Sequence, residues 1–213
     1  MKDGHYYYEI GKGTSTYHPF SLSKRSEVNI EISTVRKKIG NISADLEKNI
    51  KGKWTKIGST TIKPNGQGEE LVYGLSAGKY RLILKNPKDQ ITLVEYDRYT
   101  RKKKAAYKKS KAIKINGDIY NIYTTEEQAP RWYKTTVSSV KQKKYIYVSK
   151  ETVEGGFKFS IYKKGKKKAI KTMKLGKKEQ KFLLPKQKGT YYIKVSKLTK
   201  KTNGVYEIED FTY

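Results

Sequence analysis

Few residues in this chain have the types and spacing that enzyme chemistry needs. The two histidines, His5 and His18, stand neither in a zinc-site spacing nor beside a G-x-S-x-G nucleophile elbow. The acidic pairs at 69–70 and 126–127 are sequence neighbours, which in a strand point to opposite faces and do not form the paired carboxylates of a hydrolase. The sequence therefore predicts a protein that is not an enzyme and uses no metal or cofactor. A hydrolase or an inhibitor would require residues that converge only in the fold.

Lysine is the residue type that dominates the chemistry of the chain. Lys and Arg total 48 against 20 Asp and Glu, a formal net charge of +28 in 213 residues. Lysine is a hydrated point charge that suits diffuse attraction to anionic polymers, whereas sequence-specific reading of nucleic acid relies on the fork of arginine. We therefore expect affinity for polyanions without specific nucleic-acid binding. The alternative is a charged surface that only keeps the protein soluble.

The basic residues gather in three segments. Residues 101–111 contain seven basic residues and no acidic one, and residues 163–181 contain ten lysines and one acid. A loop at 197–201 adds further charge. The predicted polyanion-binding residues are Arg101, Lys102, Lys103, Lys104, Lys163, Lys164, Lys166, Lys167, Lys168, Lys200 and Lys201.

Tyrosine offers a second mode of binding. The chain holds 19 tyrosines, and Tyr147, Tyr162 and Tyr192 point away from the core in the alternation of their strands. These three residues are the candidate aromatic platform of a matrix-binding or protein-binding adhesion module, which is the alternative to polyanion binding. Salt separates the two, because binding to a polyanion releases counterions and weakens steeply with ionic strength.

Alternating apolar residues predict strands throughout the chain. Val28, Ile30 and Ile32 share one face of a strand, as do Tyr191, Ile193 and Val195. Strands of five to eight residues, separated by Gly and Asn turns, are typical of antiparallel β-sandwiches. No segment shows sustained helical periodicity. The predicted fold is all-β, with two tandem antiparallel β-sandwiches of the jelly-roll type.

The chain contains the same turn-and-strand motif twice. A Gly-x-Tyr turn opens the strand at 78–84 and again the strand at 189–195, an offset of 111 residues. Other strands correspond in the same order with a similar offset, as expected of duplicated domains with loops of different length. We therefore predict a first sandwich at 1–100, a basic linker at 101–111 and a second sandwich at 112–213.

The second half resembles a known family. The segments 132–137, 157–162, 189–195 and 204–208 look like the strands of the bacterial pre-peptidase C-terminal domain, and through it resemble the collagen-binding domains of clostridial collagenases. The first half matches less well. The resemblance implies a jelly-roll-like sandwich in a secreted Gram-positive protein, acting as a non-catalytic module that binds matrix or as an accessory domain of a secreted hydrolase.

Some members of that family bind calcium near the N-terminal edge of the domain. Here Arg131 stands where the family usually has an aspartate, and the nearby acids are Asp118, Glu126 and Glu127. Because calcium takes about six or more oxygen ligands, often from several carboxylates, we do not expect a calcium site of the family type.

The composition also bears on location. There is no cysteine, and no apolar run approaches the roughly 20 residues that span a membrane. With the family resemblance, this favours a secreted or cell-surface protein whose leader peptide is absent from this sequence. The expected partner is an anionic polymer such as teichoic acid, or an extracellular protein.

Overall fold

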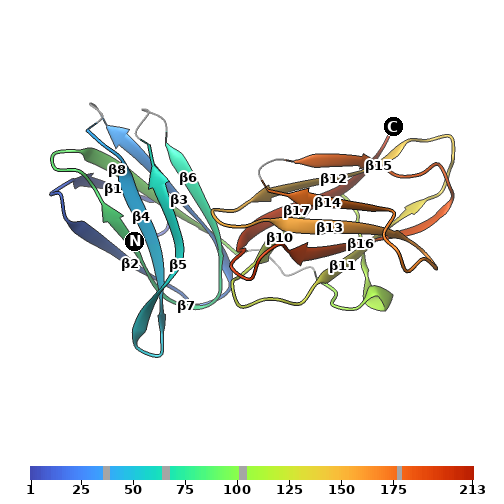
Figure 1. Ribbon diagram of the computed structural model, residues 1–213, viewed down its shortest axis with the longest axis horizontal. Coiled ribbons are helices and arrows are strands. Elements are labelled where there is room, and N and C mark those ends of the chain that lie inside the picture. The colour runs from blue at the N-terminus through green and yellow to red at the C-terminus, as the bar shows by residue number, and fades with distance from the viewer. Residues whose placement is uncertain (36–38, 64–67, 101–104, 177–178) are drawn as a thin grey trace. The chain divides into compact units, whose positions relative to one another are not determined.

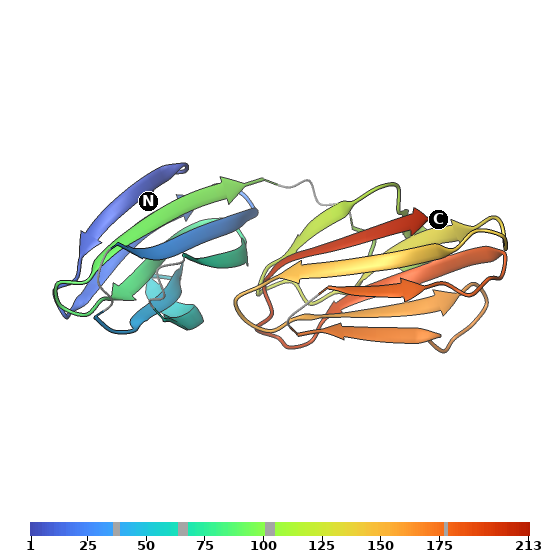
Figure 2. The same cartoon turned by 90° about the horizontal axis from the view of Figure 1, so that it is seen from above.

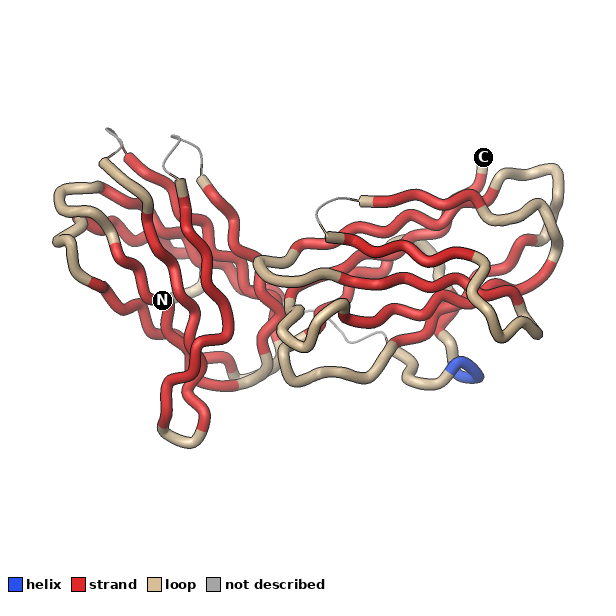
Figure 3. Tube along the Cα trace, viewed as in Figure 1, coloured by secondary structure: helices blue, strands red, loops and turns tan. Residues whose placement is uncertain are grey.

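A computed structural model describes residues 1–35, 39–63, 68–100, 105–176 and 179–213. The chain divides into two compact units, 1–100 and 101–213 (Figure 1). The regular structure of the described residues is strand, apart from the short 3-10 helix η1 (Lys109–Lys111) drawn in blue in Figure 3. The predicted all-β fold is confirmed.

The described residues of the first unit form eight strands in two antiparallel sheets. Their order is β1-β8-β3-β6 in one sheet and β2-β7-β4-β5 in the other. The strands are β1 (His5–Ile10), β2 (Ser15–Leu22), β3 (Ser26–Val35), β4 (Ile42–Ile50), β5 (Lys53–Ile62), β6 (Glu69–Leu75), β7 (Gly78–Lys85) and β8 (Ile91–Tyr99).

Where the structure describes the second unit, it has nine strands, also in two sheets (Figure 2). One sheet has the order β10-β17-β12-β15, and the other has the order β14-β13-β16-β11-β9, in which β9 runs parallel to β11. The strands are β9 (Ile113–Lys114), β10 (Ile119–Tyr123), β11 (Arg131–Val137), β12 (Lys144–Glu151), β13 (Phe157–Lys163), β14 (Lys171–Leu175), β15 (Gln180–Leu183), β16 (Gly189–Lys197) and β17 (Gly204–Thr212).

Both units have the same topology. Replacing β1 to β8 by β10 to β17, in order, converts the two sheets of the first unit into those of the second, which adds only β9. Two four-stranded sheets with this strand order form a jelly roll. The topology gives every strand of the first unit an equivalent in the second, so sites on the two units can be compared position by position.

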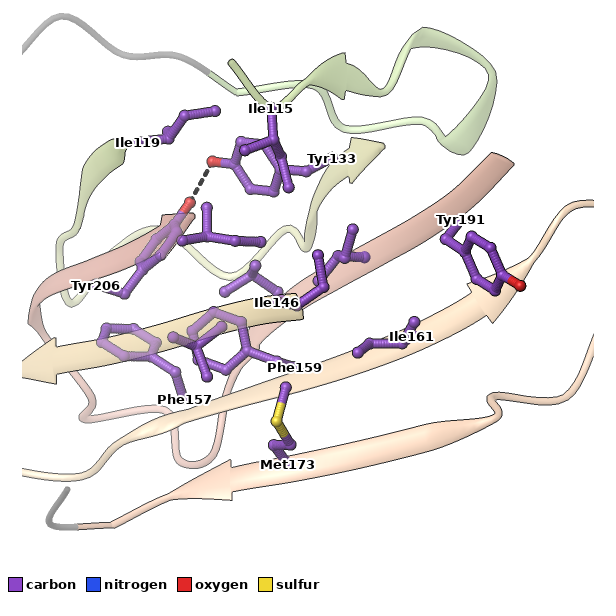
Figure 4. Close-up of a cluster of buried hydrophobic side chains, with 14 of the residues drawn as sticks. Ile115, Ile119, Tyr133, Ile146, Phe157, Phe159, Ile161, Met173, Tyr191 and Tyr206 are labelled. Carbon is purple, nitrogen blue, oxygen red and sulfur yellow. Dashed lines mark hydrogen bonds between the residues drawn. The ribbon is translucent and has the colours of Figure 1, made fainter. Parts of the chain in front are cut away.

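The alternation read from the sequence sets which residues fill the cores. Ile30, Ile32, Ile193 and Val195 are fully buried, as predicted. Figure 4 shows the core of the second unit, where apolar side chains from both sheets meet and the Tyr133 and Tyr206 hydroxyls lie 2.5 Å apart. Burial raises the pKa of Tyr133, so its phenol is neutral there. Tyrosine therefore builds this core as well as the surface.

The glycines of the repeated turn have a backbone role. Gly78 opens β7 with φ +155° and Gly189 opens β16 with φ +136°. Both values lie in the region that residues with a Cβ rarely adopt. The Gly-x-Tyr signal thus marks the same backbone turn in both units.

Candidate functional site

The side of the five-stranded sheet that faces away from the core, here called the β16 face, is the most basic surface that the strands build. Because Tyr191, Ile193 and Val195 point into the core, Tyr192 and Lys194 lie on the β16 face. The strands of this sheet, all within the described residues, contain no Asp or Glu. The lysines at outward positions of the strands are Lys114, Lys134, Lys158, Lys174 and Lys194.

Three aromatic rings lie among these lysines. Tyr162 on β13 is paired with Tyr192 on β16, and the ring of Trp132 on β11 lies 5.6 Å from that of Tyr162. Lys194 is the cross-strand partner of Trp132 and places its Nζ 5.8 Å from the ring centroid. Two of the three predicted platform tyrosines therefore share one surface, and Trp132 joins them.

Lys109 completes the cluster from outside the sheet. Its Nζ lies 5.9 Å from the Trp132 ring centroid, 5.3 Å from that of Tyr162 and 4.9 Å from that of Tyr192. An ammonium within about 6 Å of an aromatic face is attracted by the ring quadrupole. The three rings therefore hold the Lys109 charge over the β16 face.

The segment that carries Lys109 packs against the sheet edge. The Trp132 backbone N–H donates to the Ala106 carbonyl at 2.7 Å, and the Ile115 N–H donates to the Lys134 carbonyl at 2.9 Å. Residues 105–111, expected in a basic linker, thus pair with or contact β11 and form part of the second unit. The physical reason is that β11 would otherwise leave its backbone groups unpaired at the edge. The candidates Arg101, Lys102, Lys103 and Lys104 lie outside the described residues.

The other predicted lysines fall at two opposite ends of the sheet. Lys163 is paired with Tyr191 near the start of β16, while Phe157 is paired with Lys197 at its end, about 20 Å away at the rise of a strand. The loop with Lys164, Lys166, Lys167 and Lys168 therefore lies at the Gly189 end of this sheet. Lys200 and Lys201 follow the opposite end, where Lys201 lies 3.6 Å from Glu154. The predicted lysines do not form one strip.

Tyr147 belongs to a different surface. It lies on β12, in the other sheet of the unit. Its neighbours Ile146 and Val148 are buried, so the Tyr147 side chain points away from the core on the outer side of that sheet and is not part of the β16 face. Its hydroxyl donates to Glu179 at 2.7 Å, and this hydrogen bond raises the pKa of Tyr147 to about 12. The predicted platform of three tyrosines is therefore corrected: only Tyr162 and Tyr192 share a surface. Alternation within one strand shows which residues point outward, but it does not reveal to which sheet that strand belongs.

The other sheet of the second unit carries the acids that the β16 face lacks. Glu207 and Glu209 lie at intermediate exposure on β17. Burial, followed by the charges of Asp118, Glu207 and Asp210, raises the pKa of Glu209. Charge is thus segregated between the two sheets, and an anionic ligand would favour the β16 face.

Arg131 does not take part in either surface. Its side chain is fully buried, with the guanidinium 3.7 Å from the ring centroid of Tyr123, and it forms an ion pair of 2.8 Å with Glu127. Its Nη1 also donates to the Tyr206 hydroxyl at 3.3 Å. Sequence reasoning treated Arg131 only as the replacement for a calcium-binding aspartate. No local signal marks it as buried, because its partners come from two other strands and a loop.

The remaining candidates for chemistry have structural surroundings. His18 Nε2 lies 2.7 Å from Glu9, which also accepts hydrogen bonds from Thr16 and Asn86. In the part of the chain that the structure describes, no three His, Asp or Glu side chains gather as a metal site. The same residues contain no helix long and apolar enough to cross a membrane.

No protein-family model matches the chain, and no curated protein matches it. Among solved structures, it is similar to the PBSX exported protein XepA, at 10% identity over 99% of this chain and 86% of that one, with a TM-score of 0.35. It is also similar to the CBM22-1-CBM22-2 tandem domain of Paenibacillus barcinonensis Xyn10C, at 10% identity, 91% and 81% coverage and a TM-score of 0.29. A putative secreted protein from Parabacteroides distasonis matches at 9% identity, 95% and 86% coverage and a TM-score of 0.30. Likenesses this distant carry no argument about function.

Proposed function

We propose that this is a non-catalytic, secreted or cell-surface protein that binds an anionic cell-wall or extracellular polymer, such as a teichoic acid, through the β16 face. One observation carries the proposal: the strands of one sheet contain no carboxylate and present outward lysines around three clustered rings. The lysines at 163–168 lie at one end of the same sheet. Fixed ammonium groups without nearby acids attract phosphate or carboxylate along a chain.

The dimensions of the face suit a polymer more than a small molecule. The nine residues of β16 extend over about 30 Å, and outward lysines occur along this sheet from β11 to β14. Several weak ionic contacts can therefore act on one chain at the same time. The rings of Trp132, Tyr162 and Tyr192 add apolar faces against which sugar or polyol units can pack.

The adhesion function remains the second candidate, because the same three rings are clustered and partly exposed. In that case a protein or matrix partner packs on the rings, and charge is secondary. We also propose that the second unit is related to the pre-peptidase C-terminal family, whose motif positions fall on β11, β13, β16 and β17. Three of these strands are neighbours in one sheet.

Co-sedimentation with Gram-positive cell walls, with and without teichoic acid, tests the proposal over a salt series. The test variant is K134Q/K158Q/K194Q, and the matched control is K141Q/K143Q/K186Q, which removes the same charge from exposed loop positions of the same unit. We expect the test variant to bind at least about tenfold more weakly and to lose roughly one unit of salt slope per contact removed.

The control should retain nearly all of the binding. Equal losses in the two variants would mean that net charge alone is responsible, and the β16 face would lose its assignment. Binding that resists salt and is lost in Y162A/Y192A would favour the adhesion function instead.

A further inference from the structure

The first unit carries its own cluster of rings on the equivalent sheet. We call the side of β2-β7-β4-β5 that faces away from the core the Arg81 face. The Arg81 guanidinium lies 4.4 Å from the ring centroid of Trp54 and 4.9 Å from that of Tyr17. Tyr17 is on β2, Arg81 on β7 and Trp54 on β5, so the cluster crosses the whole sheet, a width of about 14 Å for four strands. The Tyr17 side chain is 56% exposed and that of Trp54 37%.

Carboxylates hold this cluster and neutralise it. Glu47, directly opposite Arg81, accepts a hydrogen bond from its Nε at 2.7 Å and forms an ion pair with its Nη2, also at 2.7 Å. Asp45 forms a 2.5 Å ion pair with Lys56 and accepts a hydrogen bond from Ser59 at 2.5 Å. Burial acts to raise the pKa of Asp45, but the hydrogen bonds of Lys56 and Ser59 outweigh it and hold that pKa below its ordinary value. Arg81 and Lys56 therefore each have an acidic partner on this face.

The Arg81 face and the β16 face occupy equivalent positions, but only the Arg81 face carries carboxylates beside its cations. In the strand correspondence, Arg81 on β7 is equivalent to Tyr192 on β16. Arg81 pairs with Pro19, and Tyr192 pairs with Lys134, so Pro19 and Lys134 are equivalent positions. Tyr17 and Trp132 each lie two residues earlier and are therefore equivalent as well. Glu47 then takes the place of Tyr162. The aromatic character of the site is common to both units, whereas carboxylates stand beside the rings only in the first.

We propose that the Arg81 face is a second binding site, which takes an uncharged saccharide chain. The ring faces of Tyr17 and Trp54 offer apolar area to the C–H faces of pyranose rings. The carboxylates of Glu47 and Asp45, held in place by their ion pairs, accept hydrogen bonds from sugar hydroxyls, and such bonds to charged acceptors are the stronger kind. Arg81 fixes the two rings on either side of it, which lowers the entropy lost on binding.

The chemistry of the face favours this ligand over two others. A polyanion would meet Glu47 and Asp45 beside the rings, so it gains little there. A proline-rich peptide needs aromatic rings that form a groove, whereas Tyr17 and Trp54 stand on the surface of a sheet with Arg81 filling the space between them.

Tryptophan fluorescence tests the site directly, because the chain has two tryptophans, one per unit. In the full chain with W132F, Trp54 is the only reporter. Titration with uncharged hexasaccharides of glucose and of N-acetylglucosamine, at high salt, should give a saturable change for at least one of them. In the same background Y17A should bind at least about tenfold more weakly, as expected of a ring at the centre of a contact. The matched control is Y8A, which removes a 76% exposed tyrosine from the other sheet of the same unit.

Calorimetric titration of the natural chain with the same sugars gives an independent readout, and thermal unfolding shows whether Y17A remains folded. The lysine variant K134Q/K158Q/K194Q should bind the uncharged sugar normally, so failure of one proposal is distinguishable from failure of the other. The proposal is overturned if neither hexasaccharide binds, or if Y8A weakens binding as much as Y17A. It is also overturned if a proline-rich peptide, and not the sugars, produces the Trp54 signal.

Discussion

Individual charged residues inside the sandwiches depend on contacts that their sequence neighbours do not supply. Arg131 is fully buried yet has Glu127 and two tyrosine rings around it. Glu9 is 8% exposed and is held by His18, Thr16 and Asn86. Removing one partner of a buried ion pair lowers the free energy of unfolding by more than the pair contributes to it, because the remaining buried charge has no opposite charge beside it. Both groups therefore make good tests of the fold.

E127A should destabilise the second unit by about 3–5 kcal/mol, because it leaves the guanidinium of Arg131 buried without its carboxylate. Urea denaturation measures the loss. The double variant R131M/E127A should recover part of it, since no buried charge then remains. The control is E154A, which breaks the exposed pair with Lys201 and should cost less than about 1 kcal/mol. Similar losses in E127A and E154A would contradict the burial of Arg131.

Glu9 should make the first unit sensitive to acid. Burial acts to raise its pKa, but the hydrogen bonds from His18, Thr16 and Asn86 outweigh it, so the folded pKa is lowered from 4.5. A carboxyl with a lowered folded pKa contributes stability above its unfolded pKa and loses it as pH falls through the folded value. E9Q should therefore be less stable than the natural chain at pH 7, and the difference should shrink below about pH 4. A difference that stays constant from pH 7 to pH 3 would be inconsistent with this role.

At the scale of elements, the added segment of the second unit is the main departure from the repeated topology. Residues 105–115 cover the edge of β11, and η1 places Lys109 over three rings of the β16 face. The first unit has no equivalent of β9 among its described residues. A segment outside the repeat has thus become part of the candidate site.

K109M should weaken both the docking of this segment and polymer binding. The methionine keeps much of the apolar stem but removes the ammonium that lies near Trp132. We expect faster amide hydrogen exchange at Trp132, whose N–H donates to Ala106, and a shifted Trp132 emission in a W54F background. K111M, next to it on the exposed side of η1, is the matched control. No change in exchange for K109M would show that the rings do not hold the segment.

G189A should destabilise the second unit by about 1–3 kcal/mol, because φ +136° strains a residue with a Cβ. G78A should have a similar effect on the first unit, at φ +155°. The control is G176A, where an added Cβ meets no atom within 4 Å and φ is not positive. Thermal unfolding of the three variants compares them. Equal stability of G189A and G176A would mean that the turn tolerates side chains.

At the scale of the whole molecule, the excess of positive charge is unevenly distributed. The sheet that forms the β16 face contains no carboxylate on its strands, whereas the equivalent sheet of the first unit pairs Arg81 with Glu47 and Lys56 with Asp45. Two sandwiches of one topology thus present different surfaces at the same position. This difference is the basis for assigning an anionic polymer to one unit and an uncharged saccharide to the other.

Calorimetry of the full chain should show two unfolding transitions, since each unit is a compact body with its own sheets. E127A should lower the midpoint temperature of one transition, and E9Q should lower that of the other. Added salt should raise at least the transition that E127A lowers, because a net charge of +28 repels itself and salt screens that repulsion. A single transition shifted equally by both variants would contradict independent units.

The sequence by itself determined the features that depend on local order. Alternation placed Val28, Ile30, Ile193 and Val195 in the cores, and Gly78 and Gly189 marked the repeated turn, because side-chain direction in a strand follows from position along that strand. Composition alone revealed the excess of lysine.

Only the tertiary structure decided which strands share a sheet, and the site follows from that. It placed Tyr162 beside Tyr192 but Tyr147 on the other sheet, separated the lysines at 163–168 from Lys200 and Lys201, and brought Lys109 over the rings. It also gathered Tyr17, Arg81 and Trp54 from three strands of one sheet. The physical reason is that strand pairing joins segments far apart in the chain through backbone hydrogen bonds, which are the same for every sequence, so the local pattern of residues does not specify the partner.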